Sequence, residues 1–190
     1  MRGSVVAFDL DNTLGDFALV SSLWPERTVP KKKFSSFCRM MNKNMQVYSP
    51  LLSIIPSLVN ARERGELSAI VMYTNNNGHP SWASAIAGHI GLLNGTRVFD
   101  AVVPAFRPEL GENQCRRSSQ KSYADLCRCL ALPEGTKICF VDDQEHTWMR
   151  CPHVEYVKVS PYYCNDRRST RRFTRRRATR VGKTRRAAYR

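Results

Sequence analysis

Five polar side chains closely follow short apolar runs of this chain, and their types suit the chemistry of phosphate and metal ions. They are Asp9, Asp11, Thr74, Asp142 and Asp143. Short apolar runs of this kind are typical of buried parallel strands, and ligands of open α/β sheets bind beyond the carboxyl ends of such strands. We therefore expect these side chains to converge on one crevice, where Lys121 adds an ammonium group. Four carboxylates, a hydroxyl and an ammonium group predict a magnesium and phosphate site.

Asp9 and Asp11 are the candidate catalytic acids. They lie two positions apart at the end of an expected strand, so both side chains point the same way. Two carboxylates so close repel each other unless a cation lies between them or one of them holds a proton. An ionised Asp9 beside a metal can attack phosphorus, and a protonated Asp11 can protonate the departing alkoxide and later take a proton from water.

The remaining candidates would bind the phosphoryl group and the metal. Thr74 and Asn75, with the backbone N–H groups that follow Thr74, can donate to phosphoryl oxygens. Lys121 can neutralise charge on both the phosphoryl group and the aspartyl nucleophile, as phosphoryl transfer requires. The candidate ligands of Mg²⁺, a hard cation that prefers oxygen, are Asp9, Asp11, Asp142 and Asp143.

The elements that must position these residues alternate between strand and helix, which predicts an α/β fold with a mainly parallel sheet. We expect strands at 5–8, 69–73, 99–104, 138–141 and 154–159, and helices at 50–64, 81–90 and from Ser118 or Ser119 to Leu130. Residues 15–47 contain two structure-breaking prolines and three consecutive lysines, and we interpret them as a flap that leans over the crevice. Trp24, Phe34 and Phe37 of this flap would form an apolar wall for a substrate or pack onto the body.

In their order along the chain, four of these features resemble the motifs of haloacid dehalogenase (HAD) superfamily phosphatases. They are the segment 9–13 (DLDNT), Thr74, Lys121 and the pair Asp142-Asp143. The first motif, the flap and the sequence Tyr73-Thr74-Asn75 resemble more narrowly the small CTD phosphatase (FCP/SCP-like) branch.

The resemblance covers residues 1 to about 160 and implies a Rossmann-like fold with a phospho-Asp9 intermediate. It also implies that Asp9, the backbone carbonyl of Asp11 and one of the last two acids hold Mg²⁺, with Asp143 favoured as the direct ligand and Asp142 behind it. That branch usually has Asp-Asn in the fourth motif, whereas this chain has Asp-Asp, and a run of three asparagines at 75–77 is also unusual. Other magnesium-dependent members, including nucleic-acid end phosphatases, therefore stay open.

The positive charge of the chain is concentrated at its C-terminus. The net charge is +14, yet residues 1–166 carry only +2, because residues 167–190 hold 12 lysines and arginines and no acid. We predict a phosphatase domain at 1–163 and a disordered basic tail at 164–190, since the tail has almost nothing to bury. Such a tail can bind nucleic acid through phosphate charges or act as a nuclear-import signal.

The cysteines and the N-terminus bear on the compartment. Seven cysteines without regular spacing argue against a disulfide framework and favour a reducing environment, and the grouping of Cys127, Cys129, Cys139 and Cys151 fits no standard zinc site. No signal peptide and no run of about 20 apolar residues is visible. We expect an intracellular protein, cytoplasmic or nuclear, that is not secreted, binds no membrane and is a monomer; a viral source stays open. His146, near the acidic pair, is expected in a surface or loop role.

The prediction that follows is a magnesium-dependent phosphomonoester hydrolase acting on phosphoserine or phosphothreonine of a protein. One alternative is a nucleic-acid 3′- or 5′-end phosphatase that the basic tail holds on the polymer. The second alternative is a non-catalytic basic nucleic-acid-binding protein, against which the intact motif residues count.

Overall fold

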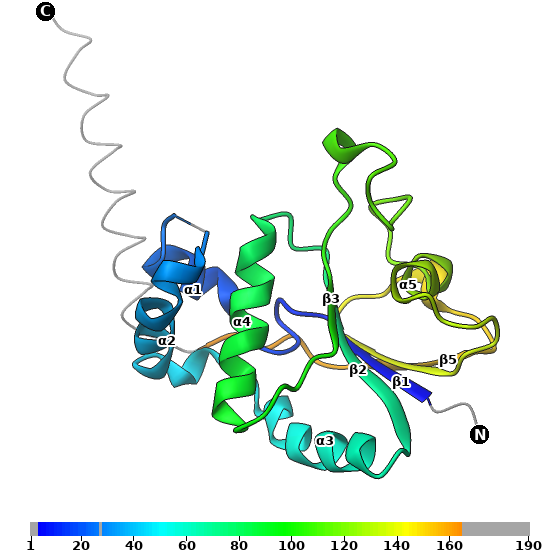
Figure 1. Cartoon of the computed structure of the whole chain (residues 1–190), viewed down its shortest axis with the longest axis horizontal. Coiled ribbons are helices and arrows are strands. Elements are labelled where there is room, and N and C mark those ends of the chain that lie inside the picture. Colours follow the sequence, from blue (N-terminus) through cyan, green and yellow to red (C-terminus); the bar gives the residue numbers. More distant parts are fainter. Residues whose placement is uncertain (1–3, 27, 165–190) are drawn as a thin grey trace, which may run out of the picture.

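A five-stranded parallel sheet forms the centre of the molecule, with strand order β3-β2-β1-β4-β5 (Figure 1). The structure is a computed structural model that describes residues 4–26 and 28–164. Its strands are β1 (Ser4–Phe8), β2 (Leu67–Tyr73), β3 (Ala101–Val103), β4 (Ile138–Asp142) and β5 (Val154–Lys158). In the register, Val5 of β1 lies opposite Ala69 on one side and Ile138 on the other. The predicted α/β class with a mainly parallel sheet is therefore confirmed.

Helices cover both faces of the sheet, which is consistent with a Rossmann-like fold. They are α1 (Phe17–Leu23), α2 (Phe34–Asn42), α3 (Ile55–Glu63), α4 (Pro80–Leu93) and α5 (Tyr123–Leu130), with short 3₁₀ turns at Lys31–Lys33, Met45–Val47, Pro50–Ile54, Pro108–Leu110 and Thr147–Met149. Alternate strand residues point to opposite faces. Val6 and Phe8 pack in the core beneath α1 to α4, whereas Val5 and Ala7 pack with Leu126 of α5.

The expected elements are present, but the helix before β4 begins later than the sequence suggests. We predicted a start at Ser118 or Ser119, whereas α5 begins at Tyr123 and its cap is Ser122, whose side chain accepts from the N–H of Asp125 at 3.1 Å. Ser122 stays extended because its backbone N–H donates to the hydroxyl of Tyr73, on β2, at 3.1 Å. Lys121 therefore lies in the loop before the helix rather than in its first turn.

The inserted segment 15–47 packs onto the body and does not lean over the acidic crevice. Phe37 of α2 is fully buried and meets Trp24 and Trp82 in edge-to-face contacts, with ring centroids 5.6 and 5.7 Å apart. Figure 1 shows α1 and α2 beside α4, away from α5. The prediction that the flap lies over the crevice is wrong. The segment lies beside α4 because its aromatic side chains are buried against that helix. Of its two suggested roles, the aromatic cluster has the packing role.

The last described residues return to the loop that follows β1. We call residues 160–164 the C-terminal strap. The backbone N–H of Tyr162 donates to the carbonyl of Asn12 at 2.7 Å, the side chain of Asn12 donates back to the carbonyl of Tyr162, and the N–H of Cys164 donates to Asp16. The strap thus pairs with residues next to Asp11. The predicted disordered tail lies, apart from Cys164, outside the described residues.

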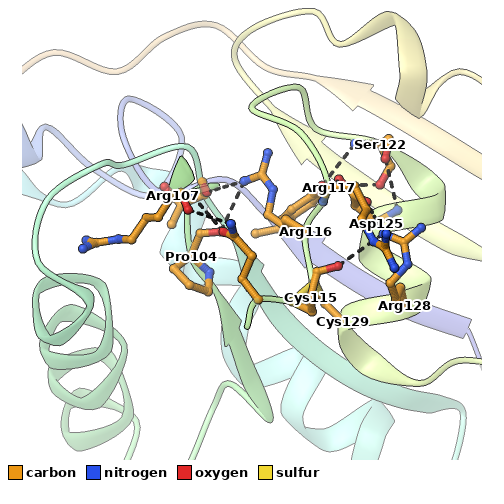
Figure 2. Close-up of a disulfide and its surroundings, with 12 residues drawn as sticks. Pro104, Arg107, Cys115, Arg116, Arg117, Ser122, Asp125, Arg128 and Cys129 are labelled. Carbon is orange, nitrogen blue, oxygen red and sulfur yellow. Dashed lines mark hydrogen bonds and ion pairs between the residues drawn. A yellow bond between two sulfur atoms is a disulfide. The ribbon is translucent and has the colours of Figure 1, made fainter. Parts of the chain in front are cut away.

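One cysteine pair departs from the expectation of reduced thiols. Cys115 and Cys129 form a disulfide that joins the loop before α5 to the end of that helix (Figure 2). The two residues are 14 positions apart and have no spacing that marks them, so only the fold of the loop brings them together. Among the helices at 4–26 and 28–164, none has both the length and the apolar character that a membrane span needs.

Candidate functional site

A cavity of about 290 Å³ lies at the carboxyl ends of β1, β2 and β4. This is the edge where parallel α/β sheets place their ligands. The described residues that line it are Asp9, Asp11, Thr74, Asn75, Asn76, Asn77, Lys121, Asp142, Gln144 and His146. Every predicted site residue except Asp143 lies on this lining, and Asp143 contributes an oxygen to the acidic cluster described below. None of the described residues of the segment 15–47 lies on the lining of the cavity.

The loop after β1 is held by its backbone and by Thr13. Asp9 continues the sheet, since its N–H donates to the carbonyl of Val141 at 2.9 Å. Asn12 adopts a left-handed conformation with a φ of 61°, one that asparagine tolerates better than most residues. Gly15 is needed where the chain turns back, because a Cβ there would lie 2.6 Å from the carbonyl oxygen of Val47. The loop is thereby fixed with Asp9 and Asp11 facing the cavity.

Thr13 connects this loop to the acidic pair at the end of β4. Its buried hydroxyl donates to a carboxylate oxygen of Asp143 at 2.9 Å and accepts from the Asp143 backbone N–H at 3.0 Å. One threonine side chain therefore sets both the position of residue 143 and the direction of its carboxylate. Thr13 matches the last position of the first motif, and the structure gives it a supporting contact rather than a contact with the cavity.

Lys121 lies between two buried carboxylates. Its ammonium group forms ion pairs with Asp9 and Asp142, the second at 2.7 Å, and only 2% of the Lys121 side chain is exposed. The ring centroids of Phe140 and Tyr73 lie 5.6 and 5.9 Å from its nitrogen, which supports a cation there. A lysine near a helix start is usually solvated, whereas Lys121 lies in the centre of the acidic cluster.

Burial and these contacts shift the acids in opposite directions. Burial raises the pKa of Asp9 to about 7, although the nearby Lys121 charge acts to lower it. Burial also acts to raise the pKa of Asp142, but hydrogen bonds from His146 and Lys121, with the Lys121 charge, outweigh it and hold that pKa below its usual value. Without further positive charge, Asp142 keeps the ammonium group as its partner and Asp9 tends to hold a proton.

Asp11 and Thr74 are linked through the asparagine run that follows β2. Burial raises the pKa of Asp11, whose carboxylate accepts from the side-chain amide of Asn76 at 2.8 Å. The backbone N–H of Asn76 donates to the hydroxyl oxygen of Thr74 at 2.9 Å, which leaves the hydroxyl hydrogen to donate elsewhere. Asn75 is exposed on the cavity lining. The raised pKa shifts Asp11 towards its protonated form, which is the form that a general acid requires.

The acidic cluster fits a hard divalent cation. Oxygens of Asp9, Asp142 and Asp143 lie within 4.8 Å of one another, and Lys121 is the only lysine or arginine of the described residues that forms an ion pair with them. Both oxygens of Asp142 already have partners: one accepts from the N–H of Gln144, and the other faces Lys121 and His146. The three carboxylates thus carry more negative charge than one ammonium group offsets, and oxygen-only donors suit a metal such as Mg²⁺.

Sequence reasoning missed the contacts of three lining residues. His146 was expected in a surface or loop role, but it is buried, with its Nε2 3.3 Å from an oxygen of Asp142. Asn76 was considered only for its backbone N–H, whereas its side chain bonds Asp11. Gln144 was not singled out at all. All three lie within four residues of a motif residue, and that proximity was the only available signal. Among the described residues, the cysteines and histidines form no group of three that could hold a metal ion.

The chain was compared with protein-family models, curated proteins and solved structures, and none of them matched it.

Proposed function

We propose that this protein is a magnesium-dependent phosphomonoester hydrolase of the HAD type, working through a phospho-Asp9 intermediate. The observation that carries this proposal is the convergence of Asp9, Thr74, Lys121 and the end of β4 on one cavity, from positions more than 100 residues apart. No single one of these residues would support it, since each type is common at strand ends. Their combination matches what phosphoryl transfer needs: a nucleophile, an acid and offsetting positive charge.

The residues divide the work according to their surroundings. The Asp9 carboxylate attacks phosphorus, and Asp11, whose raised pKa favours the protonated form, gives a proton to the leaving alkoxide. Asp11 then accepts a proton from the water that hydrolyses the phospho-aspartate. Thr74 and Asn75 donate hydrogen bonds to the phosphoryl oxygens. The ammonium group of Lys121 offsets the charge that Asp9 and the phosphoryl group share.

Asp9, Asp143 and the backbone carbonyl of Asp11 would hold Mg²⁺, while Asp142 keeps Lys121 and His146 in place. When bound, the cation would keep Asp9 ionised and offset charge on the phosphoryl oxygens. Asp143 suits direct ligation better than Asp142 because only one of its oxygens has a partner among the described residues, namely Thr13.

The substrate is proposed to be a phosphorylated macromolecule, in the first place a phosphoserine or phosphothreonine protein. The cavity is small, and exposed residues such as Asn75, Asn77 and Gln144 form part of its lining. A cavity of this kind accommodates a phosphoryl group on a protruding chain more readily than it encloses a whole metabolite.

One observation favours the second candidate, a nucleic-acid end phosphatase. The strap pairs with Asn12 and Asp16, so the 12 lysines and arginines of residues 167–190 follow a segment that is attached beside the candidate nucleophile loop. A polycation that starts there could hold a phosphate polymer near the cavity.

The test is a magnesium-dependent panel of phosphopeptides and of 3′- and 5′-phosphorylated oligonucleotides. Asp9→Asn should lower turnover by on the order of 1,000-fold or more. Asp100→Asn, which changes a carboxylate bound to Arg62 outside the cavity, is the matched control and should retain activity. Deleting residues 167–190 should spare peptide turnover but weaken oligonucleotide turnover in a salt-dependent way. Wild-type protein no more active than Asp9→Asn on the whole panel would refute the proposal and leave only a binding role.

A further inference from the structure

Arg116 is the bulkiest of the fully buried side chains, with 2% exposed, and it belongs to none of the motifs discussed so far. It lies in the loop between β3 and α5, and an arginine in a loop is ordinarily solvated. Instead, its guanidinium group donates to three backbone carbonyls: those of Thr74 at 3.1 Å, Pro104 at 3.3 Å and Ser119 at 3.1 Å. No carboxylate of the described residues forms an ion pair with it. Figure 2 shows Arg116 reaching from the loop towards Pro104.

The three carbonyls belong to segments that must be aligned in the proposed reaction. Thr74 directly follows β2 and carries the hydroxyl that would donate to the phosphoryl group. Ser119 lies two residues before Lys121, in the loop that brings the ammonium group into the cavity. Pro104 directly follows β3. One guanidinium group therefore ties the end of two neighbouring strands to the loop of Lys121.

Tyr73 provides a second connection between the same segments. The guanidinium carbon of Arg116 lies 4.9 Å from the centroid of the Tyr73 ring, and the nitrogen of Lys121 lies 5.9 Å from it. The Tyr73 hydroxyl accepts from the N–H of Ser122, the residue after Lys121. The tyrosine ring is thus contacted by both cations, and its hydroxyl restrains the backbone next to Lys121.

The residues on either side of Arg116 are fixed to α5. Cys115 forms the disulfide with Cys129, and its carbonyl accepts from Arg128 at 3.2 Å. The backbone N–H of Arg117 donates to the carboxylate of Asp125 at 3.1 Å (Figure 2). The backbone of Arg116 is consequently held on both sides, which restricts the position from which its side chain reaches the three carbonyls.

The burial of the Arg116 guanidinium group costs free energy, which suggests that the contacts it makes serve a purpose in the protein. Burying a guanidinium group without a carboxylate sacrifices its hydration, and burial lowers the pKa of Arg116 accordingly. An apolar side chain could fill the same space more cheaply, but it could not join three carbonyls. We propose that Arg116 is a positioning residue that fixes Lys121 relative to Thr74, so that both meet the same phosphoryl group. This inference rests on the proposed function for its catalytic consequence, but the placement of Lys121 can be tested without activity.

The test compares Arg116→Met and Arg116→Lys with wild-type protein, and Arg117→Met serves as the matched control because Arg117 is exposed and offers only its backbone to the contacts described. The first readout is acetylation of Lys121 by acetic anhydride, measured by mass spectrometry relative to the exposed Lys137. Buried Lys121 should be protected in wild-type protein and in Arg117→Met, and labelled several-fold faster in Arg116→Met. Arg116→Lys, which keeps the charge but spans fewer carbonyls, should be intermediate.

The second readout is kinetic. A misplacement of catalytic groups by about 1 Å costs on the order of 100-fold, so kcat/KM should fall about 10- to 100-fold in Arg116→Met and recover in part in Arg116→Lys. Mg²⁺ affinity, measured by calorimetry, should not fall, because no acid of the cluster contacts Arg116 and a displaced Lys121 takes a competing positive charge away from Asp9; general loosening of the fold would weaken Mg²⁺ binding.

The outcomes separate the two proposals. If Lys121 is labelled faster in Arg116→Met while the wild-type protein has no phosphatase activity, the proposed function is refuted and the positioning role of Arg116 is supported. If Arg116→Met does not fold, the labelling and kinetics of Arg116→Lys test the positioning role instead. Labelling and kcat/KM equal to wild type in a folded Arg116→Lys would overturn the positioning role.

Discussion

Replacing Lys121 by methionine tests the charge balance of the cavity most directly. Methionine has a similar length and no charge, so the substitution removes the ammonium group and leaves little empty space. Asp9 and Asp142, which are 6% and 0% exposed, would then lose their shared cation. Removing one partner of a buried ion pair costs about 3–5 kcal/mol, because the remaining charge is buried without compensation.

This cost is a large part of the stability of a domain, which is usually about 5–15 kcal/mol. With a urea dependence of about 2 kcal/mol per molar, it corresponds to a midpoint lower by about 1.5–2.5 M. The assay is urea unfolding followed by circular dichroism in EDTA at pH 7.5. Lys137→Met changes an exposed lysine whose side chain, within the described part of the chain, bonds only the carbonyl of Pro152, and it should alter stability by no more than about 0.5 kcal/mol.

The pH dependence of this cost follows from the direction of the pKa shifts. Lys121 lowers the pKa of both Asp9 and Asp142, so its removal raises both. When the pKa of a carboxyl group is higher in the folded than in the unfolded protein, the folded protein binds more protons between the two values, and stability rises as the pH falls. The destabilisation by Lys121→Met should therefore shrink between pH 7.5 and pH 5.

Mg²⁺ should reduce the cost at pH 7.5 in the same way, because it supplies positive charge to the folded protein only. A loss smaller than about 1 kcal/mol in EDTA at pH 7.5 would refute the claim that the ammonium group is the main partner of these buried acids. A loss that stays the same at pH 5 and in millimolar Mg²⁺ would show that shape, not charge, explains it.

Three further predictions concern other supports of the fold and the site. Thr13→Val removes the hydroxyl that holds Asp143 and should weaken Mg²⁺ binding about 10- to 100-fold in calorimetry, as expected for an outer-shell partner of a metal ligand. Replacing Cys115 and Cys129 together by serine should lower the free energy of unfolding by about 2–4 kcal/mol in urea, because the unfolded chain loses a cross-link. Burial lowers the pKa of His89, so its stabilising contribution is complete above pH 6.5 and is lost as the pH falls through its folded-state pKa, which urea unfolding from pH 8 to pH 5 can measure.

Each of these predictions has its own control. Thr136→Val changes a buried threonine outside the cavity lining, and should cost stability without affecting Mg²⁺. Dithiothreitol should reduce the stability of wild-type protein to that of the double serine variant and leave the variant itself unchanged. The variant His89→Gln should lack the part of the pH dependence that belongs to this residue. An equal pH dependence in both proteins, or a double serine variant as stable as oxidised wild type, would contradict the respective assignment.

The convergence of the site residues could be predicted because it depends on local patterns. Each apolar run ends at its polar residue, and parallel pairing places the ends of β1, β2 and β4 at one edge of the sheet. Asp9, Thr74 and Asp142 therefore had to be neighbours once the strands were recognised. This argument needs no long-range contact beyond the order of the strands.

What the sequence could not reveal depends on contacts between distant side chains. Arg116 is one of several arginines in a polar loop, and only the carbonyls around it make its burial possible. The disulfide of Cys115 depends on how that same loop folds over α5. From the sequence, the aromatic side chain of Phe37 could have faced the crevice or α4. It faces α4 because it packs against Trp82, 45 positions further along the chain.

The displaced flap has a consequence for how the proposed enzyme would choose its substrate. With segment 15–47 packed against α4, the described lining of the cavity comes from loops that would contact the phosphoryl group itself, and the carrier of that group would remain at the open side. Contacts to a phosphoryl group cannot distinguish one phosphomonoester from another. Discrimination would then have to come from binding outside the cavity, and the strap, which pairs with Asn12 and Asp16, would offer one surface for it. Tyr162, whose hydroxyl also donates to the carbonyl of Gln46, would thus connect substrate choice to the loop of the proposed nucleophile.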